Sequence, residues 1–347
     1  MSLKIVNKQD VASFVSSIMT HYDVVGPVAK ENKFAFAPIT DAAQVRLDYN
    51  TSILPPKKAL LPQEETLFKF ETDGGFSTQL VFDIRPRVIL GVHTCDLQAM
   101  KLIDAVFTKG YPDEHYLKRR ENTVIIGVEC LTPCDEHSFC KSMGTLSASD
   151  GYDLHLTDLG DAYAVDVSTS AGEALMARHV MARHAQVRDA SREDMARMNQ
   201  VLSDKWPRFP YKLDFDASEL PSLMAVSYKS PLWDELGAKC LACGQCTIVC
   251  PTCYCFNVVD EVSLDGKSGE RKRIWDSCQL DEFARIGSGE NFRKNRSQRQ
   301  RHRFFRKGKY LPDNHGELGC VGCGRCARAC LVDITPVSVF NALYKAR

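Results

Sequence analysis

The sequence predicts an α/β domain over residues 1–220, followed by a mainly α-helical domain over residues 221–347. Two observations lead to this division. Before residue 220, short apolar runs alternate with helical stretches, which is typical of α/β domains. After Pro221, short helical segments surround loops that are rich in cysteine. A chain of 347 residues is long enough for two or three domains with sizeable cores.

The first part contains four apolar runs that we expect to form strands. They cover residues 87–92, 123–128, 154–157 and 163–167, and residues 158–161 form the turn between the last two. Helices are expected over residues 97–106 and 192–206. Because strand ends of α/β domains gather at one edge of the sheet, residues that follow these strands are candidates for a site.

Eight of the 15 cysteines form two runs with the spacing C-x2-C-x2-C-x3-C. This spacing is typical of chains that hold two [4Fe-4S] clusters, in which the last cysteine of each run binds the other cluster. We therefore predict one ligand set of Cys240, Cys243, Cys246 and Cys330, and a second set of Cys320, Cys323, Cys326 and Cys250. Gly244 and Gly324 lie inside the loops, where backbone amides can approach the cluster sulfurs.

Zinc and disulfides are weaker interpretations of the two runs. Zinc ribbons use C-x2-C pairs set well apart, and disulfides need an oxidising compartment. Sixty-nine residues separate Cys250 from Cys320, more than in compact two-cluster ferredoxins. Helix-forming residues around 279–285 favour a helical ferredoxin domain over a β-rich one.

The other seven cysteines form two groups. Four of them follow the predicted strands and are candidates for a third [4Fe-4S] cluster: Cys95, Cys130, Cys134 and Cys140. Buried or free thiols, a redox-active disulfide and a zinc site are the alternatives for these four. Cys253, Cys255 and Cys278 exceed the ligand count of the two runs, and we expect them to pack near the clusters rather than bind them.

The formal net charge is zero, so no global field directs the chain to nucleic acid or to a membrane. The start of the chain lacks an apolar signal core, and no apolar run approaches about 18 residues. We therefore expect a cytoplasmic chain without a membrane span. Residues 291–310 carry nine lysines and arginines and no acid. Their expected role is to offset the negative charge of the clusters or to dock a protein; a solvated helix face and nucleic-acid binding are the alternatives.

The sequence lacks the motifs of several enzyme classes. No G-x-G-x-x-G follows a strand, no G-x-x-x-x-G-K-[ST] loop is present, and no Ser-His-Asp or H-E-x-x-H constellation stands out. We therefore expect no flavin or nicotinamide bound by this chain and no catalytic residue. Clusters transfer one electron at a time, so the sequence predicts an electron relay.

Several segments together resemble one family. They are residues 54–58, 91–96, 139–144, 156–160, 240–256, 275–278, 291–293, 301–303 and 320–326. These segments resemble the iron–sulfur subunit shared by anaerobic sulfite reductases, as their A subunit, and cytoplasmic sulfhydrogenases, as their beta subunit. The resemblance spans roughly residues 50–345. Where this family often has a second cysteine before Cys140, the chain has Ser138, and Cys134 is the candidate replacement.

The resemblance implies a cytoplasmic complex of several subunits. A flavin-containing subunit linked to NAD(P)H or ferredoxin would exchange electrons with this chain, and a catalytic subunit of NiFe-hydrogenase or sirohaem sulfite-reductase type would use them. The isolated chain is then expected to carry about 8 to 12 irons and to turn over no substrate unaided. Two other functions stay open: a self-sufficient oxidoreductase with a substrate site near Cys95 and Asp96, and a nucleic-acid-associated iron–sulfur protein.

Overall fold

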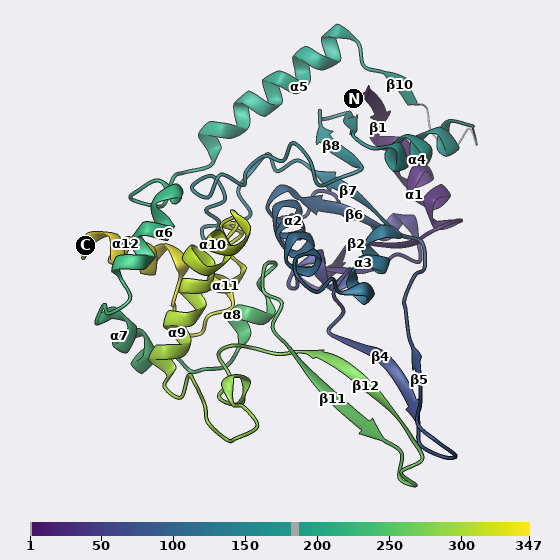
Figure 1. Ribbon diagram of the computed structural model, residues 1–347. Helices are drawn as coiled ribbons and strands as arrows, with labels where there is room; N and C mark the ends of the chain where they lie inside the picture. Colours follow the sequence, from purple (N-terminus) through teal and green to yellow (C-terminus); the bar gives the residue numbers. More distant parts are fainter. Residues whose placement is uncertain (1, 182–186) are drawn as a thin grey trace.

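The computed structural model describes residues 2–181 and 187–347. Figure 1 shows an α/β part around a large sheet, a group of short helices beside it, and a smaller sheet that projects from both. The large sheet contains the strands β1 (Ser2–Asn7), β2 (Asp23–Lys30), β3 (Lys33–Pro38), β6 (Arg87–His93), β7 (Thr123–Val128), β8 (Leu154–Asp158), β9 (Ala162–Val167) and β10 (Val187–Asp189).

The order of the large sheet is β10-β1-β9-β8-β7-β6-β2-β3. The strands β2, β6, β7 and β8 are parallel neighbours, and the other pairs are antiparallel. Every residue of β6 and β7 is buried, as their continuous apolar runs predict for central strands. The four strands expected from the sequence are all present, which confirms the α/β assignment for the N-terminal part.

Five helices accompany the large sheet: α1 (Val11–Met19), α2 (Thr94–Thr108), α3 (Glu114–Glu121), α4 (Ser170–Met181) and α5 (Arg192–Lys205). Both helices expected from the sequence, over residues 97–106 and 192–206, correspond to α2 and α5. A capping box of Ser191 and Asp194 begins α5. Within the described residues, no helix combines the length and the apolar character that crossing a membrane requires.

The smaller sheet joins distant parts of the chain. Its strands are β4 (Glu64–Glu71), β5 (Ser77–Leu80), β11 (Phe256–Val262) and β12 (Ser268–Trp275), in the order β11-β12-β4-β5. The antiparallel pairing of β12 with β4 unites a hairpin from before residue 220 with a hairpin from after it. The two parts that the sequence separates at residue 220 therefore share this sheet.

The long insertion between the cysteine runs corrects one expectation. It begins with the β11–β12 hairpin, and the region around residues 279–285 contains only a three-residue 3₁₀ turn, Glu282–Ala284. The β-branched Val258, Val259 and Val262 favour a strand, and Asp265-Gly266 supplies the turn. The helices of the C-terminal part are α6 (Leu220–Val226), α7 (Leu232–Lys239), α8 (Gln245–Ile248), α9 (Arg296–Phe305), α10 (Leu311–His315), α11 (Arg325–Arg328) and α12 (Pro336–Lys345).

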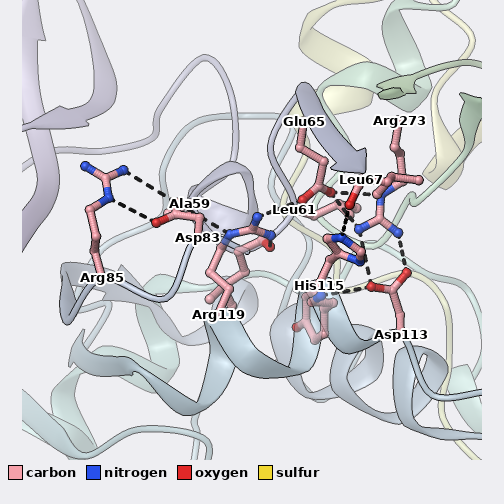
Figure 2. Close-up of polar contacts among 12 residues, drawn as sticks. Ala59, Leu61, Glu65, Leu67, Asp83, Arg85, Asp113, His115, Arg119 and Arg273 are labelled. Carbon is pink, nitrogen blue, oxygen red and sulfur yellow. Dashed lines mark hydrogen bonds and ion pairs between the residues drawn. The ribbon is translucent and has the colours of Figure 1, made fainter. Parts of the chain in front are cut away.

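A buried ion-pair network attaches the smaller sheet to the α/β part (Figure 2). Glu65 on β4 accepts hydrogen bonds from Arg119 of α3 at 2.7 Å and from Arg273 of β12 at 2.6 Å. Arg273 also pairs with Asp113, just before α3. Burial raises the pKa of Asp113, but the hydrogen bonds from Arg273 and the Tyr116 amide, together with the charge of Arg273, outweigh burial and lower the pKa. Since each buried guanidinium has a carboxylate, the network holds the sheet in one position.

His155 on β8 makes the stability of the fold depend on pH. Burial and, second, the charge of Lys205 lower its pKa to about 4, while the Glu129 carboxylate 4.0 Å away is already paired with Lys205. In the unfolded chain the His155 imidazole binds a proton near pH 6.5, whereas in the folded chain it stays neutral at that pH. The free energy of unfolding should therefore fall as the pH drops from about 6.5 towards 4, by up to roughly 3 kcal/mol from this group.

The variant His155→Gln, which carries no titrating ring, should lose less stability over the same pH range. Thermal midpoints of both proteins between about pH 4 and 8 provide the measurement. Equal slopes in the two proteins would exclude His155 as a source of the acid sensitivity.

Candidate iron–sulfur sites

The first predicted ligand set lines one cavity beside α8 and the segment that precedes α12. Its thiols are those of Cys240, Cys243, Cys246 and Cys330. Gln300 of α9 donates from Nε2 to Cys240 Sγ at 2.9 Å, and the Ile334 amide donates to Cys330 Sγ at 3.2 Å. Donors of this kind stabilise thiolate ligands and tune a cluster. The cavity thus combines three cysteines of one run with the last cysteine of the other.

The second predicted ligand set gathers around α11, and its four cysteines are partly buried. Burial raises the pKa of Cys320, Cys323 and Cys326, because it penalises the thiolate form. The charge of Cys250 raises all three pKa values further, so Cys250 lies near the three thiols of the opposite run. Free thiolates in such a place are costly, whereas a bound cluster draws negative charge away from sulfur.

The four N-terminal cysteines also meet. Cys95 begins α2 after β6, and Cys130 lies two residues beyond β7, at the same edge of the sheet. Burial raises the pKa of Cys130, and the charges of Cys134 and Cys140 raise it further. Burial also raises the pKa of Cys95, and the charges of Asp96, of Cys323 from the second set and of Cys130 raise this pKa further. This thiol group is therefore contiguous with the second ligand set.

A buried ion pair joins the N-terminal thiols to the second cysteine run. Arg325 of α11 donates to both carboxylate oxygens of Asp96, at 2.6 and 2.7 Å, and to the carbonyl oxygen of Ser52 at 3.1 Å. Arg325 is 3% exposed and Asp96 1%. Sequence reasoning missed the role of Arg325. The position of this arginine inside a cysteine run and the position of Asp96 directly after Cys95 were the available signals, but neither reveals the pairing.

Buried cations surround the cysteines without carboxylate partners. They are Lys57, Arg303 and Lys307, each less than a tenth exposed. Burial lowers the pKa of Arg303 and of Lys307, but nearby thiolates raise both pKa values overall. The largest of these charges is that of Cys246 for Arg303 and that of Cys250 for Lys307. Among the described residues, no carboxylate forms an ion pair with any of the three. Buried positive charge of this kind fits the anionic clusters, and it explains part of the basic segment 291–310.

The second cysteine run packs so closely against residues 137–140, here called the N-terminal loop, that two of its positions require glycine. Gly322 has φ +67°, and a Cβ there would lie 2.6 Å from the Cys140 amide nitrogen. The Phe139 amide donates to the Gly322 carbonyl at 2.7 Å. Gly324, with φ +75°, would place a Cβ 2.7 Å from the His137 carbonyl carbon. Backbone therefore packs on backbone at this junction.

We predict that Gly322→Ala separates the second run from the N-terminal loop. The matched control is Gly316→Ala, because Gly316 has φ +76° and no atom within 4 Å of a Cβ. Both variants pay the left-handed cost of about 1–2 kcal/mol, and Gly322→Ala should lose roughly 1–3 kcal/mol more from the clash. Anaerobic denaturation of the two proteins measures the difference, and equal losses would contradict a tight junction.

Across residues 2–181 and 187–347, no three Cys, His, Asp or Glu side chains form a group that could hold a single metal ion. Zinc requires its ligands at one atom, whereas a cubane offers four separate irons. The zinc interpretation of the cysteines thus gains no support from their arrangement.

Comparison with known proteins agrees with this chemistry. Residues 239–334 match a family described as a 4Fe-4S dicluster domain. The chain is also 33% identical over 326 residues to sulfhydrogenase 2 subunit beta of Pyrococcus furiosus, an alignment that covers 92% of this chain and 91% of that protein. These findings confirm two predictions, the pair of [4Fe-4S] clusters and an electron-transfer iron–sulfur subunit. The chain belongs to the family of iron–sulfur subunits that includes the sulfhydrogenase beta subunit.

Proposed function

We propose that this chain relays electrons between a flavin-containing subunit linked to NAD(P)H or ferredoxin and a hydrogenase-type catalytic subunit in a cytoplasmic complex. One observation carries the proposal: the thiol groups form an uninterrupted series. The charge of Cys246, from the first set, raises the pKa of Cys326, from the second. Cys323 of the second set in turn acts on Cys95 and Cys140. Adjacent sites of this kind suit sequential one-electron transfer.

The ligand assignment is part of the proposal. Cys240, Cys243, Cys246 and Cys330 would hold the first [4Fe-4S] cluster, and Cys320, Cys323, Cys326 and Cys250 the second. A third cluster would be held by Cys95, Cys130, Cys134 and Cys140, which supply four mutually interacting thiols, two of them buried and two partly buried. The finer division into an α/β domain over residues 1–220 and a mainly helical ferredoxin domain over residues 221–347 belongs to the same proposal.

Each cluster, when bound, supplies a one-electron carrier. The chain's own residues fix the carriers and set their surroundings. Arg303 lies near thiols of the first and second sets and keeps positive charge between them. Arg325 does the same between the second set and the N-terminal thiols, with Asp96 as its counter-charge. Buried packing around these groups excludes water, which strengthens their electrostatic effect on the sites.

The name of the relative favours a hydrogenase as the catalytic partner, since that protein is a subunit of a sulfhydrogenase. The test is anaerobic affinity purification of the full chain, followed by analysis of iron, labile sulfide, flavin, nickel and sirohaem in the isolated chain and in its complex. We expect cluster-dependent EPR signals and no turnover from the isolated chain, and flavin and nickel in the complex.

Three results would overturn parts of this proposal. Stoichiometric zinc without labile sulfide would remove the clusters. Turnover of a substrate by the isolated chain would make it a self-sufficient oxidoreductase. A sirohaem partner in place of a nickel partner would assign the complex to sulfite reduction.

A further inference from the structure

Three cysteines outside the ligand sets proposed above gather at the base of the β11–β12 hairpin: Cys253, Cys255 and Cys278. Phe256 pairs with Trp275 across the hairpin, and the Asp276 amide donates to the Cys255 carbonyl at 3.0 Å. This register brings Cys278, three residues beyond β12, back to Cys255, and their thiols are hydrogen-bonded. Cys253 and Cys278 are 6% and 3% exposed.

The thiols of these three cysteines interact with one another and with both C-terminal ligand sets. The thiol of Cys253 is hydrogen-bonded to Cys250, which belongs to the second set, and the charge of Cys255 raises the pKa of Cys253. The charge of Cys246, which belongs to the first set, raises the pKa of Cys278. The three thiols, two buried and one partly buried, therefore form a group of their own that is flanked by two proposed clusters.

Buried lysines line this group. Lys57, from the short helix Pro56–Ala59, donates to the Cys253 carbonyl, and its Nζ lies 4.4 Å from the centre of the Trp275 ring. Lys307 donates to Thr252 Oγ1 at 2.6 Å. Burial lowers the pKa of Lys57 to about 8, although the charges of Cys253, Cys250 and Cys255 raise it. Within the described part of the chain, Lys57 has no carboxylate partner, so the local negative charge has to come from the sulfur side.

We propose that Cys253, Cys255 and Cys278 bind a further cuboidal iron–sulfur cluster through three thiolates. Three cysteines suit a [3Fe-4S] cluster, or a [4Fe-4S] cluster with one iron that lacks a cysteine ligand. The inference rests on one part of the proposed function, namely that this chain binds iron–sulfur clusters.

Two simpler roles account less well for the lysines. Packed cysteines are neutral and behave as small hydrophobes, so among the thiols that act on Lys57 they would leave Cys250 alone to offset its buried charge. A Cys255–Cys278 disulfide is also neutral and makes no use of Cys253. Three thiolates on an anionic cluster supply the negative charge that the lysines require.

The test compares the wild-type full chain with the triple variant Cys253→Ser, Cys255→Ser, Cys278→Ser, both prepared anaerobically. Iron, labile sulfide, Mössbauer and EPR spectra are recorded for each. We expect the variant to lose about three or four irons and about four sulfides per chain. If the lost cluster is a [3Fe-4S] cluster, the variant should lack an EPR signal of the oxidised protein. If it is a [4Fe-4S] cluster, the variant should lack an EPR signal of the reduced protein.

Two further proteins keep the result interpretable. The quadruple variant of Cys95, Cys130, Cys134 and Cys140 to Ser should lose a different spectral component, and the single variant Cys278→Ser should change only the component that the triple variant loses. If the triple variant fails to fold, the single variant and the wild-type Mössbauer areas decide the question.

Unchanged iron and sulfide in a folded triple variant, or an unchanged Mössbauer spectrum of the Cys278→Ser variant, would overturn the inference. So would differential alkylation that finds Cys255 and Cys278 joined as a disulfide, with iron content unaffected by their loss. Absence of labile sulfide from the wild type would instead overturn the proposed function itself, so the two failures are distinguishable.

Discussion

Cys330→Ala is expected to remove the first cluster and to leave the second in place, although Cys330 belongs to the second cysteine run. The physical reason is that Cys330 lines the cavity of Cys240, Cys243 and Cys246, where it completes the set of four thiols. With one corner unligated, the cluster should either be lost, with about four irons per chain, or be converted to a [3Fe-4S] cluster, with about one iron per chain. Iron analysis and EPR of the reduced protein under anaerobic conditions provide the measurement.

Cys250→Ala is the matched control, because it removes the last cysteine of the first run. The charge of Cys250 raises the pKa of Cys320, Cys323 and Cys326, which places Cys250 beside these thiols. The variant should therefore lose the second cluster and retain the first. The two variants should therefore lose different EPR components. If each variant instead damaged the cluster of its own run, the crossed assignment of ligands would be wrong.

Asp96→Asn is expected to destabilise the chain strongly, because it leaves the buried guanidinium of Arg325 without a counter-charge. Both side chains are almost completely buried and make two short hydrogen bonds. Breaking a buried pair from one side costs about 3–5 kcal/mol. The free energy of unfolding, measured by anaerobic denaturation of the cluster-loaded chain, should fall by this order.

An exposed pair of the same chemistry serves as the control. Arg271 and Asp260 form a bidentate pair on the β11–β12 hairpin, with side chains that are 43% and 42% exposed. Asp260→Asn should change the unfolding free energy far less than Asp96→Asn, because water already screens the exposed pair. The double variant Asp96→Asn, Arg325→Met should lose less than Asp96→Asn alone, since it removes the stranded charge. Similar losses in all three variants would show that the buried pair has no special role.

The Asp96–Arg325 pair also has a consequence for electron transfer. It fixes α11, which lies within the second cysteine run, against the first turn of α2, which carries Cys95. Together with the Gly322 junction, it holds the second ligand set and the N-terminal thiols at a constant separation. The rate of electron transfer depends on that separation, so the same contacts that stabilise the fold also maintain the relay.

The large sheet was predictable because its information is local. The central strands β6 and β7 are buried along their whole length, and burial on both faces requires the continuous apolar runs that the sequence displays. The helices α2 and α5 were predictable for a similar reason, since helical periodicity and the capping residues of α5 lie within one segment. The cysteine runs are local too, because one short loop has to supply three thiolates to a cluster.

The β11–β12 hairpin was not predicted, because its stability depends on a partner far away in the chain. β12 pairs with β4, and Thr66 of β4 donates to Glu270 of β12 at 2.9 Å across 204 positions. Nothing within residues 256–275 specifies that partner. The helix expected near residues 279–285 was wrong, since contacts with the rest of the chain outweigh a weak local propensity.

The sequence by itself determined the α/β character of the N-terminal part, the two iron–sulfur cysteine runs and the family, because each depends on the order of neighbouring residues. Only the tertiary structure decided that Asp96 pairs with Arg325, that Lys57 reaches the Cys253 loop, and that Cys255 meets Cys278. Those contacts join residues that are distant in the chain, and they form because buried charges and thiols need partners that only the folded packing supplies.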